Sequence, residues 1–112
     1  MGNREQGMLL RIFIGETDRA DGRALYEQIV HKAKELHLAS VTVTRGIMGY
    51  GADSEIHSAK ILRLSDDLPV IVEIIDTEEN LQKILPYLEE WIEDGFATLE
   101  KVGVIKYGKR KS

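Results

Sequence analysis

Three glycines that follow a β-branched run are the residues whose spacing could support binding chemistry. They are Gly46, Gly49 and Gly51, in the order G-x-x-G-x-G, directly after Val41–Thr44 and Arg45. Glycine permits positive φ and lets a ligand or a second backbone come close, and successive N–H groups at such a turn can cradle a small anion. Two interpretations stay open: an anion cradle, or a bulged hairpin whose glycines only make the bend.

Catalytic arrangements find little support elsewhere in the chain. A Walker loop needs lysine and Ser/Thr after its last glycine, where this chain has Ala52-Asp53, and a Rossmann fingerprint needs the opposite glycine order and an immediate helix. The acidic pairs are adjacent residues, which do not converge on one site: Asp66-Asp67, Glu78-Glu79 and Glu89-Glu90. Nothing nearby in sequence orients His57 as a base. His31 and His37 lie six apart on one helix and do not share a face for a metal. We predict that the protein is not an enzyme.

Composition limits the class of protein. The chain has 112 residues, 43% of them hydrophobic and 30% charged, which fits one globular domain with one core. The formal net charge of −4 argues against general nucleic-acid binding, which needs a basic surface. The absence of cysteine excludes disulfides, thiolate ligands and a cysteine nucleophile. No apolar run approaches the ~18 residues of a membrane span and no signal segment opens the chain, so we expect a cytoplasmic protein.

Hydrophobic periodicity predicts the elements that position the glycines. The first half of the chain is predicted to form a strand over Met8–Glu16, a helix over Arg23–His37 capped by Asp21, and a strand from Val41. The second half begins with a strand over Ile61–Leu64 and Val70–Ile75, interrupted by a turn at Ser65–Pro69. A helix capped by Asp76 follows and ends at Asp94-Gly95, and the last element is a strand over Thr98–Tyr107. Pro86 predicts a kink or split in the second helix. The order β-α-β-β-α-β predicts an α+β, ferredoxin-like sandwich with a four-stranded antiparallel sheet and two helices on one face.

The remaining segments are polar and carry no period. We expect residues 1–7 to be a disordered N-terminal tail, 8–108 the single domain and 109–112 a basic C-terminal tail. Ala52–Lys60 is predicted to be a mobile loop.

The strand VIVEII, Val70–Ile75, is apolar on both faces apart from Glu73. Helices cover only one face of the predicted sheet, so the second apolar face needs another partner. The chain has no further domain to supply it, and we therefore expect self-association.

Three segments, VTVTRGIMGYG, SDDLPVIVEIID and DGFATLEKVGVIKYG, resemble the PII-like family catalogued as domain of unknown function one hundred and ninety, over Leu9 to Gly108. The resemblance implies a PII-type homotrimer with an adenine-nucleotide site between neighbouring subunits. The PII segment that lines the nucleotide pocket matches Gly49-Tyr50-Gly51, the glycine turn before the last strand matches Asp94-Gly95, and the basic residue at that strand's end matches Lys106. Arg45, which directly precedes the first of the three glycines, and Gly46 itself complete the predicted site.

Two departures from the PII sequence pattern limit which adenine nucleotide we expect the protein to bind. A basic residue of PII is replaced by Ala52, and a lysine that follows the glycine turn is replaced by Phe96. Fewer phosphate-binding cations imply AMP or ADP rather than ATP. Arg45, Arg63, His57 and Lys106 are the cations that could compensate. Arg45 has the best claim because it precedes the glycines, and an inter-subunit salt bridge is its alternative role.

The resemblance predicts a trimeric signalling regulator in which loop 52–60 responds to the ligand and contacts a membrane or cytoplasmic protein. The alternative is a structural or metal-tolerance trimer that binds no nucleotide. Against that alternative, the chain offers few ligands for a transition metal.

Overall fold

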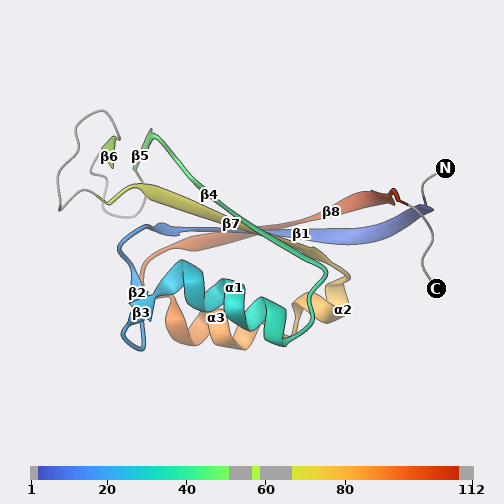
Figure 1. The fold of residues 1–112 in the computed structure, drawn as a ribbon, viewed down its shortest axis with the longest axis horizontal. Coiled ribbons are helices and arrows are strands. Elements are labelled where there is room, and N and C mark those ends of the chain that lie inside the picture. The colour runs from blue at the N-terminus through green and yellow to red at the C-terminus, as the bar shows by residue number, and fades with distance from the viewer. Residues whose placement is uncertain (1–2, 51–56, 59–66, 109–112) are drawn as a thin grey trace.

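The computed structural model describes residues 3–50, 57–58 and 67–108. Four strands form one antiparallel sheet in the order β4-β7-β1-β8, and the helices lie on a single face of it (Figure 1). The strands are β1 (Asn3–Gly15), β4 (Ser40–Arg45), β7 (Pro69–Asp76) and β8 (Phe96–Lys106), and the helices are α1 (Leu25–Glu35), α2 (Glu78–Leu81) and α3 (Leu85–Trp91). Two short ribbons pair β2 (Arg19–Ala20) with β3 (Arg23–Ala24), and β5 (Met48–Gly49) with β6 (His57–Ser58). The predicted α+β, ferredoxin-like sandwich is confirmed.

The core lies between the sheet and the helices, and alternation along the two central strands fills it. The buried side chains of the strands are Leu10, Ile12, Ile14, Val70, Val72 and Ile74, and those of the helices are Leu25, Ile29, Ala33, Leu81 and Leu88, joined by Ile84 from the connection between α2 and α3. Ile12 pairs directly with Val72 across the ladder, and directly paired residues point to the same face of a sheet. The register therefore decides which face of VIVEII packs on the helices.

None of the helices in the described part of the chain covers the opposite face of the sheet (Figure 1), to which the alternate residues of each strand point. Phe13 stacks on Phe96 with ring centroids 4.6 Å apart. Arg11 Nε donates to Glu73 Oε2 at 2.8 Å, so the charged residue of VIVEII has a partner. The apolar neighbours Leu9, Ile71 and Ile75 are only half-buried. Arg11 Nη1 also lies 3.6 Å from Glu100 Oε1 on β8. This open face thus combines half-buried apolar side chains with a cluster of charges around Arg11.

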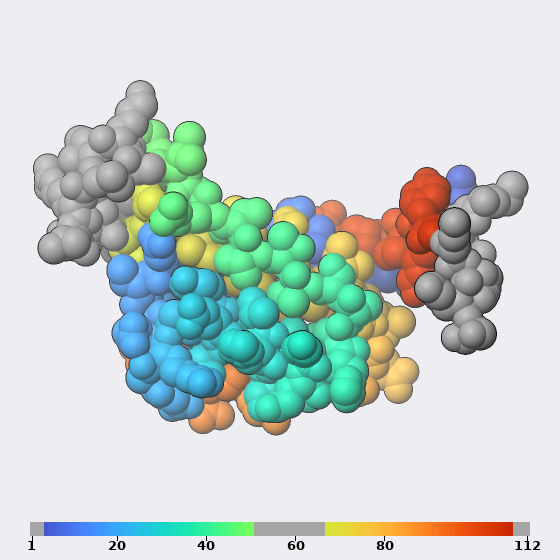
Figure 2. Space-filling view, viewed as in Figure 1, coloured from blue at the N-terminus to red at the C-terminus, as the bar shows by residue number. Residues whose placement is uncertain are grey.

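The expectation of a disordered tail over residues 1–7 is wrong for Asn3–Gly7. These residues begin β1 and pair with Val102–Lys106 of β8. The two strands continue past the helices as a two-stranded ribbon, which projects on the right of Figures 1 and 2. Gly7 is buried there, and a Cβ at this position would lie 2.9 Å from Val104 Cγ2.

The start of the first helix differs from the prediction. Asp21, expected as its cap, has φ +54°, and Gly22 has φ +79°. They are the two central residues of the turn between β2 and β3, where Asp-Gly is a preferred pair because both positions need positive φ. The helix begins two residues later than predicted, at Leu25, with Ala24 as N-cap.

The first helix ends at Glu35 with Leu36 as its C-cap, two residues before the predicted end at His37. His37 follows the C-cap in a left-handed conformation. Its φ is +61°, its N–H donates to Lys34 O, and the N–H of Leu38 donates to Ala33 O. This is the Schellman arrangement, in which glycine is the usual residue at the left-handed position.

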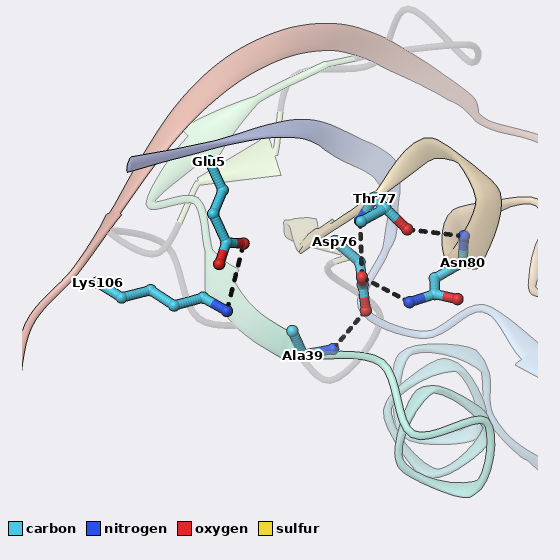
Figure 3. Close-up of polar contacts among 6 residues, drawn as sticks. All are labelled: Glu5, Ala39, Asp76, Thr77, Asn80 and Lys106. Carbon is cyan, nitrogen blue, oxygen red and sulfur yellow. Dashed lines mark hydrogen bonds and ion pairs between the residues drawn. The ribbon is translucent and has the colours of Figure 1, made fainter. Parts of the chain in front are cut away.

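The second predicted helix is split, as the proline indicated, and Pro86 lies in the first turn of α3. Its cap differs from the prediction, because Thr77 caps α2 by accepting from the N–H of Asn80. Asp76 instead accepts from Ala39, Thr77 and the Asn80 side chain (Figure 3). The helix ends at Trp91 rather than at Asp94-Gly95.

Several predicted features lie outside the described residues: Gly51, Arg63, the strand Ile61–Leu64, the C-terminal residues 109–112, and the loop 52–60 apart from His57–Ser58, which form β6. Among the described residues, none of the helices has the length and apolarity needed to cross a membrane.

Candidate functional site

The glycine bend between β4 and β5 packs closely on Pro69. The N–H of Gly46 donates to Pro69 O at 2.7 Å. A Cβ on Gly46 would lie 2.8 Å from Pro69 Cγ, and one on Gly49 would lie 3.2 Å from the same atom. The proline ring therefore accounts for glycine at both positions, and the N–H of Gly46 is already used within the chain.

Arg45 is the last residue of β4 and lies beside the bend. Its Nη1 donates to Glu16 Oε2 at 2.9 Å. The Arg45 side chain is 60% exposed and that of Glu16 is 30% exposed. The predicted phosphate-binding cation is thus paired with a carboxylate of its own chain.

Three large side chains of the bend face solvent. Ile47 is 78% exposed, Met48 58% and Tyr50 68%. Such a group of exposed apolar and aromatic side chains next to close-packed backbone can cover a flat apolar group such as a nucleobase.

The turn before β8 also needs its glycine. Gly95 has φ +152°, and a Cβ there would lie 2.7 Å from Phe13 O. Phe13 pairs with Phe96 and Gly15 pairs with Pro69, so this turn and the Gly46 bend lie at the same end of the sheet. They belong to opposite edge strands, β8 and β4.

Carboxylates gather at this end of the sheet. Burial raises the pKa of Asp18, and the neighbouring carboxylates of Asp67, Asp94 and Glu93 raise it further, against the hydrogen bond that the N–H of Gly15 donates to it. Asp94, a predicted site residue, is therefore part of a negatively charged environment.

Lys106 lies at the other end of the sheet. It is the last residue of the 11-residue β8, which places it roughly 35 Å from the Gly95 turn at the rise of an extended strand. Its Nζ lies 3.4 Å from Glu5 Oε1 (Figure 3). Within one chain, the structure thus places the bend and the glycine turn at one end of the sheet, on its two opposite edges, and Lys106 at the other end.

Sequence reasoning missed three residues that contact the predicted site. Pro69 packs on the glycines, Glu16 pairs with Arg45, and Glu5 pairs with Lys106. The strand order of the predicted fold could have indicated Glu16. This residue directly follows β1, and only β7 separates β1 from β4, so a long side chain at the end of β4 can reach it. Glu5 was hidden by the expectation of a disordered tail.

Two other features lie apart from this end of the sheet. An open depression of about 460 Å³ lies between the end of α1 and the start of β4, lined by Val30, Lys34, His37, Leu38, Ala39, Ser40 and Val41, and it contains none of the predicted site residues. Among the described residues, no three His, Asp or Glu side chains are grouped so as to hold a metal ion.

Comparison with solved structures identifies the fold as PII-like. A putative PII-like signaling protein from Thermus thermophilus superimposes with a TM-score of 0.64 at 22% identity, covering 91% of this chain and 92% of that one. CPII from Thiomonas intermedia K12, a nitrogen regulatory PII-like protein solved with ADP, AMP and bicarbonate, gives a TM-score of 0.62 at 14% identity, covering 91% of each chain.

The sequence places the chain in a family. The model of the DUF190 family, "Uncharacterized ACR, COG1993", matches residues 7–104. A UPF0166 protein of Aquifex aeolicus (strain VF5) is 42% identical over 97 residues, which are 87% of this chain and 91% of that protein. The protein belongs to the DUF190 family, as the resemblance indicated.

Proposed function

We propose that the protein is a PII-like regulator, not an enzyme, that assembles as a homotrimer and binds AMP or ADP between its subunits. The observation that supports this most is the shared fold with CPII, which was solved with ADP and AMP. Separation of the predicted site residues within one chain is consistent with a site shared between copies.

Self-association is supported by the open face of the sheet. Leu9, Ile71 and Ile75 are half-buried there, and Phe96 is 56% exposed. An apolar surface of this kind on a small domain favours an interface, and a second copy of the chain is the partner that is always present.

In this proposal, the ligand lies at the end of the sheet that holds both glycine turns. The base or ribose lies against Gly49 and Tyr50, and the phosphates point toward Asp94-Gly95. Because Lys106 lies roughly 35 Å away in its own chain, it reaches these phosphates from a neighbouring copy, and Arg45 contributes a second positive charge. Few cations at a negatively charged end of the sheet favour AMP or ADP over ATP.

Calorimetric titration with AMP, ADP, ATP and cyclic dinucleotides tests this proposal, combined with light scattering to establish the assembly. Lys106→Ala is expected to weaken nucleotide binding by roughly 1–3 kcal/mol, the value of a charge-assisted hydrogen bond. Lys83→Ala is the matched control, since Lys83 lies in the connection between α2 and α3, outside the proposed site, and it is expected to leave the affinity unchanged. If AMP, ADP and ATP all fail to bind at millimolar concentration, the nucleotide proposal is wrong.

A further inference from the structure

The predicted phosphate-binding arginine is held by a glutamate of its own chain. We propose that Glu16 is a specificity-determining residue: its carboxylate competes with the ligand's phosphates for Arg45 and so disfavours nucleotides with more phosphates. The inference rests on the proposed function, because it needs an anionic ligand at Arg45.

The position of Glu16 is fixed by its backbone. Its N–H donates to Leu68 O at 2.8 Å, and the N–H of the next residue, Thr17, donates to Asp67 Oδ1 at 2.8 Å. These bonds join the end of β1 to the residues that lead into β7. The carboxylate is therefore presented to Arg45 by a defined piece of backbone and is not a chance surface contact.

Arg45 is the more exposed member of the pair, at 60% against 30% for Glu16. An exposed ion pair is weak because water and salt screen it, so a phosphate can take the guanidinium from the carboxylate. A guanidinium forms paired hydrogen bonds equally well with carboxylate and phosphate. The glutamate thus lowers affinity for the ligand without preventing binding.

The surrounding charges make this competition depend on the ligand. Asp18, Glu93 and Asp94 lie at the same end of the sheet, and Glu93 and Asp94 are close enough to Asp18 to raise the pKa of its carboxyl further than burial alone does. Repulsion between these carboxylates and a nucleotide grows with the number of phosphate charges. With Arg45 neutralised by Glu16, the penalty is smallest for AMP, larger for ADP and largest for ATP.

The test is a double-mutant cycle on the full chain, measured by calorimetry with AMP, ADP and ATP at one fixed ionic strength. Glu16→Gln keeps the backbone N–H and the side-chain shape but removes the charge. It is expected to tighten ADP binding about two- to fivefold, which corresponds to the strength of an exposed ion pair, with a larger gain for ATP and a smaller one for AMP. In an Arg45→Gln background, Glu16→Gln is expected to give no such gain.

Glu35→Gln is the matched control. It removes the Lys32–Glu35 ion pair in the last turn of α1, which includes no residue of the proposed site. It is expected to change none of the three affinities. Thermal melts of each variant verify that the subunit remains folded.

The outcomes separate the inference from the proposed function. If the wild-type protein binds ADP and responds to Lys106→Ala, but Glu16→Gln leaves all affinities unchanged or weakens them, Glu16 only positions Arg45 and the inference is overturned alone. An equal gain in the Arg45→Gln background overturns it as well. If the wild-type protein binds no adenine nucleotide, the proposed function and the inference fail together.

Discussion

Asp76 Oδ2 accepts a hydrogen bond of 2.8 Å from the backbone N–H of Ala39 (Figure 3). The other carboxylate oxygen accepts from the N–H of Thr77 at 2.6 Å and from Asn80 Nδ2 at 2.9 Å. A single carboxylate at the end of β7 therefore fastens the first turn of α2 and the connection that leads from α1 into β4.

Asp76→Ala is expected to destabilise the protein by roughly 1–2 kcal/mol, because it removes three hydrogen bonds to a charged acceptor that is only partly shielded from water. Urea unfolding measures this loss. Thr77→Ala provides the comparison, since it removes only the N-cap bond to Asn80 and should cost about 1 kcal/mol. Equal stability of Asp76→Ala and the wild type would contradict the structural role assigned here.

The same carboxylate predicts a loss of stability in acid. Burial by itself raises the pKa of Asp76, but hydrogen bonds from Asn80, Thr77 and Ala39 outweigh it, and the pKa lies below its ordinary value of 3.8. A folded-state pKa below the unfolded one stabilises the protein fully above pH 3.8, and that contribution is lost as pH falls through the folded pKa. Below about pH 4, urea midpoints of the wild type should therefore converge on those of Asp76→Ala.

The pKa of Asp18 predicts the opposite pH dependence of stability from that of Asp76. Burial, with Asp67, Asp94 and Glu93 nearby, raises its pKa above 3.8, so its ionised form is less favourable in the folded state than in the unfolded state. That folded-state advantage of the protonated form is lost as pH rises through the raised pKa. Asp18→Asn keeps an oxygen for the N–H of Gly15 and is expected to raise the melting temperature at about pH 7 but not at about pH 3. A lower melting temperature at neutral pH would contradict this.

Periodicity predicted the core correctly because alternation directly reports which side chains are buried. Ile12 and Ile14 could be assigned to one face from the sequence, since the neighbouring Phe13 and Arg11 differ from them. Both faces of VIVEII are apolar, and only the pairing of Val72 with Ile12 decides which one packs on the helices. That pairing is a long-range contact that no local pattern contains.

Local sequence signals gave a wrong prediction where one residue pair is compatible with two different structures. Asp21-Gly22 fits a helix cap or a tight hairpin turn equally well, and the β2–β3 pairing selects the turn. Asn3–Gly7 shows no apolar alternation because none of the described helices packs against the ribbon that it forms with β8 (Figure 1). The partners of the predicted site residues were missed for a related reason: Glu16 and Arg45 are 29 residues apart and meet only through the strand order.

Neighbouring residues of β7 separate folding from assembly. Val72 is 0% exposed and faces the helices, so Val72→Asp is expected to unfold the subunit, since a buried unpaired carboxylate costs several kcal/mol. Ile71 lies on the open face, so Ile71→Asp should leave the subunit folded and weaken the proposed trimer. Circular dichroism and light scattering report the two effects. A monomeric wild type at micromolar concentration would show that the open face is not the assembly surface.

Gly95, directly before β8, and Gly103, within β8, differ sharply in the space that a side chain would have. At Gly95, with φ +152°, a Cβ would lie 2.7 Å from Phe13 O, and the obstacle is backbone of the inner strand β1. Gly103 has open space around the same position.

Gly95→Ala is expected to destabilise the protein by roughly 1–3 kcal/mol, as strained backbone positions do. Gly103→Ala should be neutral or slightly stabilising, because alanine restricts the unfolded chain more than glycine does. Urea unfolding of both variants provides the comparison, and equal effects would show that the Gly95 turn can move away from Phe13 without cost. Since the nucleotide phosphates are proposed to lie at this turn, Gly95→Ala should also weaken ADP binding, whereas Gly103→Ala should not.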